Sequence, residues 1–168
     1  MTLNGSHARW LEKANFFVGE IYHAFTSSSP TNNELIKWCF LPSGAIKINS
    51  DGSTFGEYEW VAYGALARDD RGRWIEGFCG RIGYATPLQA KLWGIRRAMK
   101  LANKKAWSEA IVETDSLIVV NLINKEEVAN HPDKTFIENC KKLKEAILLE
   151  LVHVRRKGNR CVDYMSKL

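Results

Sequence analysis

Apolar and polar residues alternate in short stretches between residues 45 and 83, which is the pattern of β-strands with one buried face. The stretch AIKINSD predicts a buried strand that ends at Asp51, where Gly52 permits a turn. Residues 60–83 contain two further apolar runs, joined by the polar sequence RDDRGR with Gly72 near its end. Because glycine readily adopts a positive φ, residues 60–83 are predicted to form a β-hairpin.

Helical spacing of apolar residues replaces this alternation in the stretch TPLQAKLWGI, which begins at Thr86. Thr86 can cap a helix, Pro87 suits its first position, and Gln89 completes a capping box. A helix is therefore predicted from Thr86 to about Lys104. Its apolar row is Leu88, Leu92, Ile95 and Met99. At roughly 100° per residue, Lys91 lies about 60° from the centre of this row, where its side chain can enter a cleft.

The remaining sequence predicts two more strands and three more helices. These are a strand at 109–114, a helix from Asp115 or Ser116 to about Asn124, a helix from about Lys134 to Leu149, a strand at 150–157, and a last helix within 159–168. Three antiparallel strands followed by crossover connections predict an α/β fold, with a mixed five-stranded sheet flanked by helices.

Residues 1–44 differ from the rest and are predicted to be an N-terminal extension and linker, followed by one domain at 45–168. Residues 8–25 have the pattern of a helix, and TSSSPTNNE then has the composition of a polar linker. The aromatic residues of the extension are Trp10, Phe16, Phe17, Tyr22 and Phe25. They can pack on their own domain, which we expect, or dock a protein partner.

Composition narrows the functional classes. A chain of 168 residues with 45% hydrophobic residues can bury a substantial core, which argues against disorder. The net charge of +5 is compatible with a nucleic-acid partner. The four cysteines have no zinc-type spacing and no secretory signal is apparent, so we expect reduced thiols in an intracellular protein, with nucleus and cytoplasm both open. We also expect a monomer. No apolar run has the length of a membrane span.

Three aspartates occupy comparable places in the predicted elements. Asp51 ends the first strand, Asp115 ends the fourth, and Asp163 lies in the first turns of the last helix. Each alone has an ordinary interpretation, as a turn residue, a helix cap or a solvated side chain respectively. Together they converge, because neighbouring strands lie under about 5 Å apart. Such a cluster repels itself unless cations such as Mg²⁺ occupy it.

Four segments of the sequence resemble the ribonuclease H-like domain. They are INSDGS, LQAKLWGIRRAMKLA, IVETDSLIVVNLI and LVHVRRKGNRCVDYMSKL. The likeness covers about residues 38–168 and is strongest to the plant group at the ends of non-LTR retrotransposon polyproteins and in related host proteins. The resemblance implies a ribonuclease H-like fold. It also implies an endonuclease that cuts the RNA of RNA–DNA hybrids with two Mg²⁺ or Mn²⁺ ions held by four acids.

The resemblance identifies Asp51, Asp115 and Asp163 as the first, third and fourth of these catalytic, metal-binding acids. The second should be a glutamate in a pattern like EAELWGL, but this sequence reads QAKLWGI and has Lys91 there. Three carboxylates and one ammonium carry a formal charge of −2 instead of −4. Metal binding is therefore expected to be weakened or lost, and cleavage to be impaired. Lys91 is expected to pair with Asp51 or Asp115 instead.

The segment RRKGNR borders the predicted cleft and supplies candidate nucleic-acid-binding residues. These are Arg155, Arg156, Lys157 and Arg160, which can contact phosphates. The connection NKEEVANHPD is short and acidic, so the basic protrusion of some ribonucleases H is expected to be absent. Three hypotheses stay open: an active ribonuclease H, a domain that binds nucleic acid without cutting it, and a domesticated protein-interaction domain.

Overall fold

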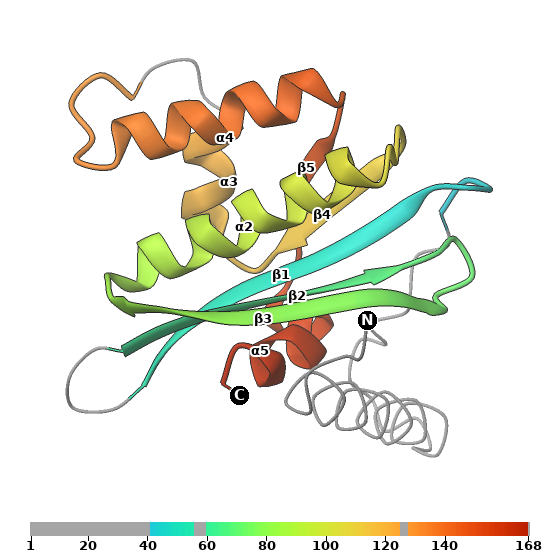
Figure 1. The fold of residues 1–168 in the computed structure, drawn as a ribbon, viewed down its shortest axis with the longest axis horizontal. Helices are drawn as coiled ribbons and strands as arrows, with labels where there is room; N and C mark the ends of the chain where they lie inside the picture. Colours follow the sequence, from blue (N-terminus) through green and yellow to red (C-terminus); the bar gives the residue numbers. More distant parts are fainter. Residues whose placement is uncertain (1–40, 56–59, 125–127, 168) are drawn as a thin grey trace, which may run out of the picture. The chain divides into compact units, whose positions relative to one another are not determined.

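The computed structural model describes residues 41–55, 60–124 and 128–167 (Figure 1). The chain divides into two compact units, residues 1–37 and 38–168, and all described residues belong to the second. The predictions for the N-terminal extension, including its helix and its aromatic residues, lie outside the described residues.

Five strands form one mixed sheet in the order β3-β2-β1-β4-β5, as the sequence predicts. The strands are β1 (Ile46–Phe55), β2 (Trp60–Arg68), β3 (Trp74–Tyr84), β4 (Ala110–Thr114) and β5 (Glu150–His153). The first three form an antiparallel meander, whereas β4 pairs in parallel with β1 and β5 pairs in parallel with β4. The predicted order of strands and helices is confirmed.

Helices cover both faces of the sheet. The three longer helices, α2 (Pro87–Lys104), α3 (Leu117–Asn124) and α4 (Lys134–Ala146), lie over one face (Figure 1). The short helix α5 (Arg160–Met165) follows a single 3₁₀ turn at Arg156–Asn159 and contacts β1 and β2 from the opposite face. None of the helices among the described residues has the length and apolar character required to cross a membrane.

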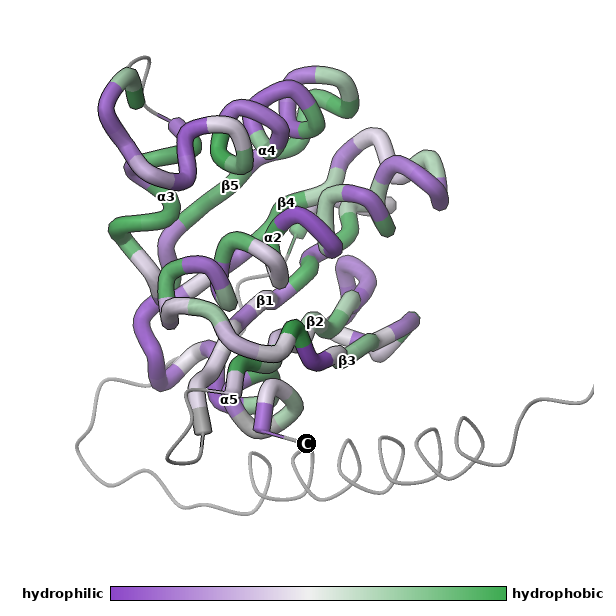
Figure 2. The backbone as a smooth tube through the Cα atoms, turned by 60° about the vertical axis from the view of Figure 1, so that its left-hand side comes forward, coloured by the Kyte–Doolittle hydropathy of each residue, from purple (hydrophilic) through white to green (hydrophobic). Residues whose placement is uncertain are grey.

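The main core lies between the sheet and α2. Ile48 of β1 and Val112 of β4 pack with Leu92, Ile95 and Met99 of α2, and all five are fully buried. Figure 2 shows hydrophobic and hydrophilic residues alternating around α2 and α4, as expected for helices that bury one face. The apolar spacing in the sequence therefore identified the correct buried side of α2.

The predicted start of α2 and the predicted hairpin turn are confirmed. The Thr86 hydroxyl accepts a hydrogen bond from the backbone N–H of Gln89 at 3.2 Å, and the Gln89 side chain accepts one from the Thr86 N–H at 3.0 Å. This capping box fixes where α2 begins. At the β2–β3 turn, Gly72 has the positive φ of 77° that the turn requires.

Three predicted boundaries are wrong. Strand β1 does not end at Asp51 but continues to Phe55, because its pairing with β2 continues to the partners Phe55 and Trp60. Helix α4 ends at Ala146 rather than Leu149, since Leu148 has a positive φ of 50°. Strand β5 ends at His153 rather than at Lys157, because Arg156 and Lys157 belong to the 3₁₀ turn that follows.

The burial of Cys140, on the inner side of α4, generates a prediction. This residue is fully buried, and burial raises the pKa of its thiol to about 12. At mildly alkaline pH the folded chain should therefore react with iodoacetamide at the partly exposed Cys161 but not at Cys140. Peptide mass mapping measures this, and denatured protein, labelled at both positions, is the control. Equal labelling of both thiols in the native chain would contradict the packing.

Candidate functional site

The register of the sheet brings Asp51 and Asp115 together. The parallel pairing of β1 with β4 ends at the partners Ser50 and Thr114, so Asp51 is the next residue of β1 and Asp115 follows directly after the end of β4. Asp51 is buried, with 2% of its surface exposed, although it lies within β1 and not at the end of the strand. The predicted convergence of these two carboxylates thus arises from strand register rather than from a turn at Gly52.

A close approach of α2 to β1 places Lys91 beside these carboxylates. A Cβ atom on Gly52 would overlap the backbone of Ala90 and lie 2.6 Å from the backbone nitrogen of Lys91. One helical turn later, a Cβ on Gly94 would lie 2.6 Å from the Ser50 hydroxyl. Both positions therefore require glycine for α2 to rest directly on β1.

The ammonium of Lys91 bridges the two buried aspartates. Its Nζ donates to Oδ1 of Asp51 at 2.5 Å and to Oδ1 of Asp115 at 2.8 Å. Burial lowers the pKa of Lys91, but its hydrogen bonds to Asp115 and Asp51 outweigh this effect and raise the pKa above its ordinary value. Burial raises the pKa of Asp51, and the bond from Lys91 opposes that rise. The sequence predicts pairing with one aspartate, and the lysine contacts both.

The third aspartate, Asp163, lies in α5 as predicted and is also paired with cations. Lys167 donates to its Oδ2 at 2.6 Å, and Arg156 donates to its Oδ1 at 3.3 Å. Partial burial raises the pKa of Asp163, but these two hydrogen bonds outweigh it and hold the pKa below its usual range. Arg156 Nε also lies 3.9 Å from Oδ2 of Asp115, so Arg156 links Asp163 to Asp115.

We call these six side chains the acid–base cluster. Its members are Asp51, Asp115, Asp163, Lys91, Arg156 and Lys167. Three carboxylates face three cations, so the formal charge of the cluster is zero. A divalent ion prefers oxygen ligands with an excess of negative charge. Within the described part of the chain, no group of three or more histidine, cysteine, aspartate or glutamate side chains is arranged to hold a metal ion. The side chains as placed therefore do not fit a divalent metal.

The basic segment after β5 contributes to the cluster unevenly. Arg156 pairs with Asp115 and Asp163 although most of its side chain is exposed, and its neighbours in the chain, Arg155, Lys157 and Arg160, are exposed as well. Asn159 anchors the segment, because its buried amide donates to the backbone carbonyl of Ser50 at 3.1 Å. Sequence reasoning missed Asn159 and Lys167. The spacing of Lys167 four residues after Asp163 in a helix was the available signal for that pair.

Comparison with known proteins identifies the family. The reverse transcriptase-like family model matches residues 49–168, which include every member of the acid–base cluster. The chain belongs to the reverse transcriptase-like family. This chain is 29% identical over 154 residues to a protein of Arabidopsis thaliana named "Putative ribonuclease H protein". The match covers 88% of this chain and 25% of that protein, so the chain spans about a quarter of the length of its relative.

Solved structures show that this reverse transcriptase-like domain has the ribonuclease H fold, as predicted. RNase H1 from the archaeon Halobacterium salinarum superimposes with a TM-score of 0.66 at 21% identity, covering 71% of this chain and 92% of that one. LC11-RNase H1 in complex with an RNA/DNA hybrid superimposes with a TM-score of 0.63 at 22% identity, covering 71% of this chain and 91% of that one. The predicted ribonuclease H-like domain is thereby confirmed, while its retrotransposon origin stays a prediction.

The contact between Gly52 and α2 yields a stability prediction. Replacing Gly52 with alanine forces α2 away from β1, so we expect Gly52→Ala to lower the free energy of unfolding by about 1 to 3 kcal/mol, as overpacked cores do. Urea denaturation measures the change. Thr54→Ala, an exposed change on the same strand, is the matched control and should leave the midpoint nearly unchanged. An unchanged midpoint in Gly52→Ala would contradict the close approach.

The bridging role of Lys91 yields a second prediction. Lys91→Met keeps the apolar stem but leaves Asp51 and Asp115 without their shared cation. We expect a loss of about 3 to 5 kcal/mol at neutral pH, the cost of breaking a buried ion pair. Urea denaturation measures it, and Lys100→Met, exposed on the same helix, is the control.

This loss should depend on pH. Without Lys91, burial and the charge of Asp115 raise the pKa of Asp51 in the folded state further above its unfolded value. Ionisation of Asp51 then costs stability as pH rises through the folded pKa, so the deficit of the variant should shrink as pH falls from neutral toward about 4. Equal deficits at neutral and acidic pH would show that Lys91 does not hold these carboxylates ionised.

Proposed function

We propose that this ribonuclease H-like domain binds RNA–DNA hybrids and that its Mg²⁺- or Mn²⁺-dependent cleavage is impaired. The observation that carries the proposal is the contact of the Lys91 ammonium with both Asp51 and Asp115. The family and the fold support a nucleic-acid ligand, since a structural relative, LC11-RNase H1, is solved with an RNA/DNA hybrid. Asp51, Asp115 and Asp163 are the proposed remnants of a catalytic, metal-binding set.

Electrostatics favours impaired metal binding over an intact metal site. Two unit charges 4 Å apart interact by about 4 kcal/mol at an effective dielectric of 20. Because a divalent ion carries two charges, its repulsion from the Lys91 ammonium at that distance is roughly twice this amount. Lys91 cannot easily leave, because its side chain is only 23% exposed and it already pairs with both carboxylates. The side chain thus supplies the positive charge that an ion would otherwise bring.

The same charge balance supports binding of phosphates. An uncompensated cluster of three carboxylates would repel a nucleic-acid backbone, whereas the acid–base cluster is formally neutral. Exposed cations at Lys157 and Arg160 follow Arg156 closely in the chain, and the whole chain carries a net charge of +5. Arg155, Arg156, Lys157 and Arg160 are the proposed phosphate-contacting residues, which position a backbone without reading its sequence.

A cleavage assay with charge variants at position 91 tests the proposal. We expect the natural chain to leave a labelled RNA–DNA hybrid uncut in Mg²⁺ or Mn²⁺. Lys91→Glu should gain metal-dependent cleavage, because it restores a fourth carboxylate beside Asp51 and Asp115. Lys91→Gln is the matched control, since it removes the ammonium without adding a carboxylate, and it should remain inactive. Denaturing gels of the RNA strand measure the products.

Binding is measured on the same hybrid by fluorescence anisotropy at several salt concentrations. We expect salt-dependent binding by the natural chain, weakened in Lys157→Gln/Arg160→Gln. Robust cleavage by the natural chain that disappears in Asp51→Asn would overturn the proposed impairment. Absence of both cleavage and binding would reject the nucleic-acid function altogether.

A further inference from the structure

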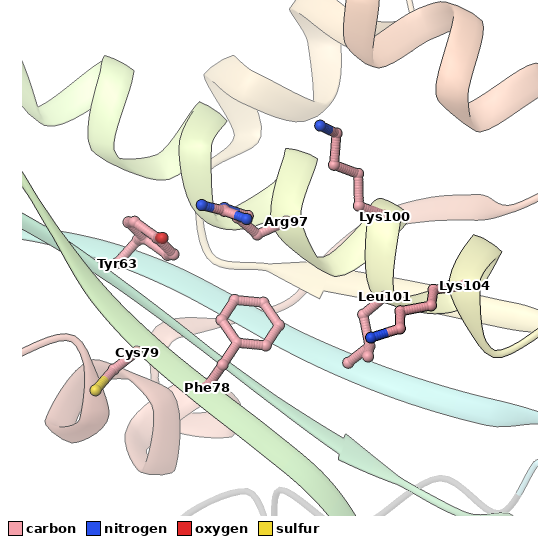
Figure 3. Close-up of a pocket in the computed structure, with 7 residues that line it drawn as sticks. All are labelled: Tyr63, Phe78, Cys79, Arg97, Lys100, Leu101 and Lys104. Carbon is pink, nitrogen blue, oxygen red and sulfur yellow. The ribbon is translucent and has the colours of Figure 1, made fainter. Parts of the chain in front are cut away.

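A second basic surface lies on α2, away from the acid–base cluster. A groove of about 350 Å³ is lined by Tyr63 of β2, Phe78 and Cys79 of β3, and Arg97, Lys100, Leu101 and Lys104 of α2 (Figure 3). At roughly 100° per residue, its three basic residues fall within about 60° of one another around α2, and at least about 120° from Lys91. The groove is therefore separate from the cluster.

Carboxylates of the described residues do not neutralise the three cations of the groove. Among the described residues, no carboxylate lies within ion-pair distance of Arg97, Lys100 or Lys104, and all three are exposed. Glu76 on the neighbouring β3 is already paired with Lys105 at 2.7 Å. Three unpaired cations on one flank of a helix produce a local positive potential that attracts an anion.

An aromatic floor lies beneath these cations. Phe78 is partly exposed, and its ring meets that of Tyr63 at a centroid distance of 6.2 Å. The row continues from Tyr63 to Trp93 at 6.5 Å and from Trp93 to Phe136 of α4 at 5.2 Å. A Cβ on Gly80 would lie 2.6 Å from the Tyr63 hydroxyl, so the absence of a side chain there lets Tyr63 lie across β3. The Phe78 ring thus has an edge contact with a buried neighbour, Tyr63.

Figure 3 shows how these groups face one another. Lys104 extends from α2 toward Leu101 and Phe78, Arg97 extends toward Tyr63, and Lys100 points away from Phe78 at the rim of the groove, while the sulfur of Cys79 points away from the groove. A ligand in the groove would meet cations from α2 and a ring face or edge from β3. A nucleotide has both matching groups, since its phosphate can pair with the cations and its flat base can contact the aromatic ring.

We propose that this groove binds single-stranded nucleic acid, with phosphates on Arg97, Lys100 and Lys104 and a base against Phe78. Proteins that hold single strands without sequence preference combine a basic groove with aromatic stacking platforms. The volume is at the small end for ligand pockets, which suits a nucleotide unit better than a duplex. The inference rests on the proposed nucleic-acid-binding function and adds a second surface, one that takes an unpaired strand.

The test measures binding of a fluorescein-labelled oligothymidylate of 12 nucleotides to the full chain. Fluorescence anisotropy gives the affinity at each of several salt concentrations. Arg97→Gln/Lys104→Gln should weaken binding and reduce the slope of log affinity against log salt by roughly 1.4, about 0.7 for each phosphate that is no longer neutralised. The matched control is Lys134→Gln/Lys142→Gln, which removes the same charge from exposed positions of α4 and should leave the slope unchanged.

A second variant tests stacking separately from charge. Phe78→Leu keeps an apolar side chain but removes the aromatic face, so we expect a roughly 5- to 100-fold loss of affinity with an unchanged salt slope. Circular dichroism melting checks that this variant is folded. Because the basic residues are exposed, the double variant remains a test even if Phe78→Leu does not fold.

Blunt RNA–DNA hybrid, measured in parallel, distinguishes failure of this inference from failure of the proposed function. Hybrid binding without oligothymidylate binding, or equal oligothymidylate binding in all variants, would overturn the groove as a single-strand site and leave the proposed function intact. If the natural chain does not bind the hybrid, the proposed function is rejected instead. Binding of oligoglutamate in place of oligothymidylate, with the same dependence on Arg97 and Lys104, would assign the groove to an acidic peptide and overturn the inference.

Discussion

The direct contact of α2 with β1 determines the arrangement of the candidate site. Gly52 and Gly94 leave no side chains between helix and strand, so the backbone of α2 lies on that of β1. This approach brings the ammonium of Lys91 within hydrogen-bond distance of Asp51. The register between β1 and β4 then adds Asp115 at the adjacent position. The centre of the acid–base cluster therefore follows from backbone geometry, and the identity of residue 91 sets its charge.

Local signals in the sequence were sufficient for the elements that depend on neighbouring residues. The Thr86–Gln89 capping box, the Gly72 turn and the apolar row of α2 involve contacts within a few positions, and the structure contains all three. Asp51, Asp115 and Lys91 could also be selected, because the alternation of strands and helices constrains which chain segments become neighbours. The family resemblance made the lysine conspicuous, since a carboxylate was expected there.

Features that depend on distant segments could not be derived in this way. The extension of β1 past Gly52 depends on its pairing with β2, which starts at Trp60. The sequence of a glycine followed by polar residues is the same whether it forms a turn or a strand packed beneath a helix, as at Gly52. The placement of Arg156 depends on Asn159, whose amide binds the Ser50 carbonyl 109 residues earlier in the chain. The aromatic row likewise joins residues of β2, β3, α2 and α4, which have no common sequence period.

The cation at the centre of the acid–base cluster is covalently attached to the chain. A bound metal ion exchanges with solvent, so the charge of a conventional acidic site changes with the concentration of free divalent ions. The Lys91 ammonium has no such dissociation equilibrium, and its raised pKa keeps it charged at neutral pH. The two buried carboxylates thus carry a tethered counter-ion. Under the proposed function, the electrostatic state of this surface and the contribution of the cluster to folding would therefore not depend on the local supply of magnesium or manganese.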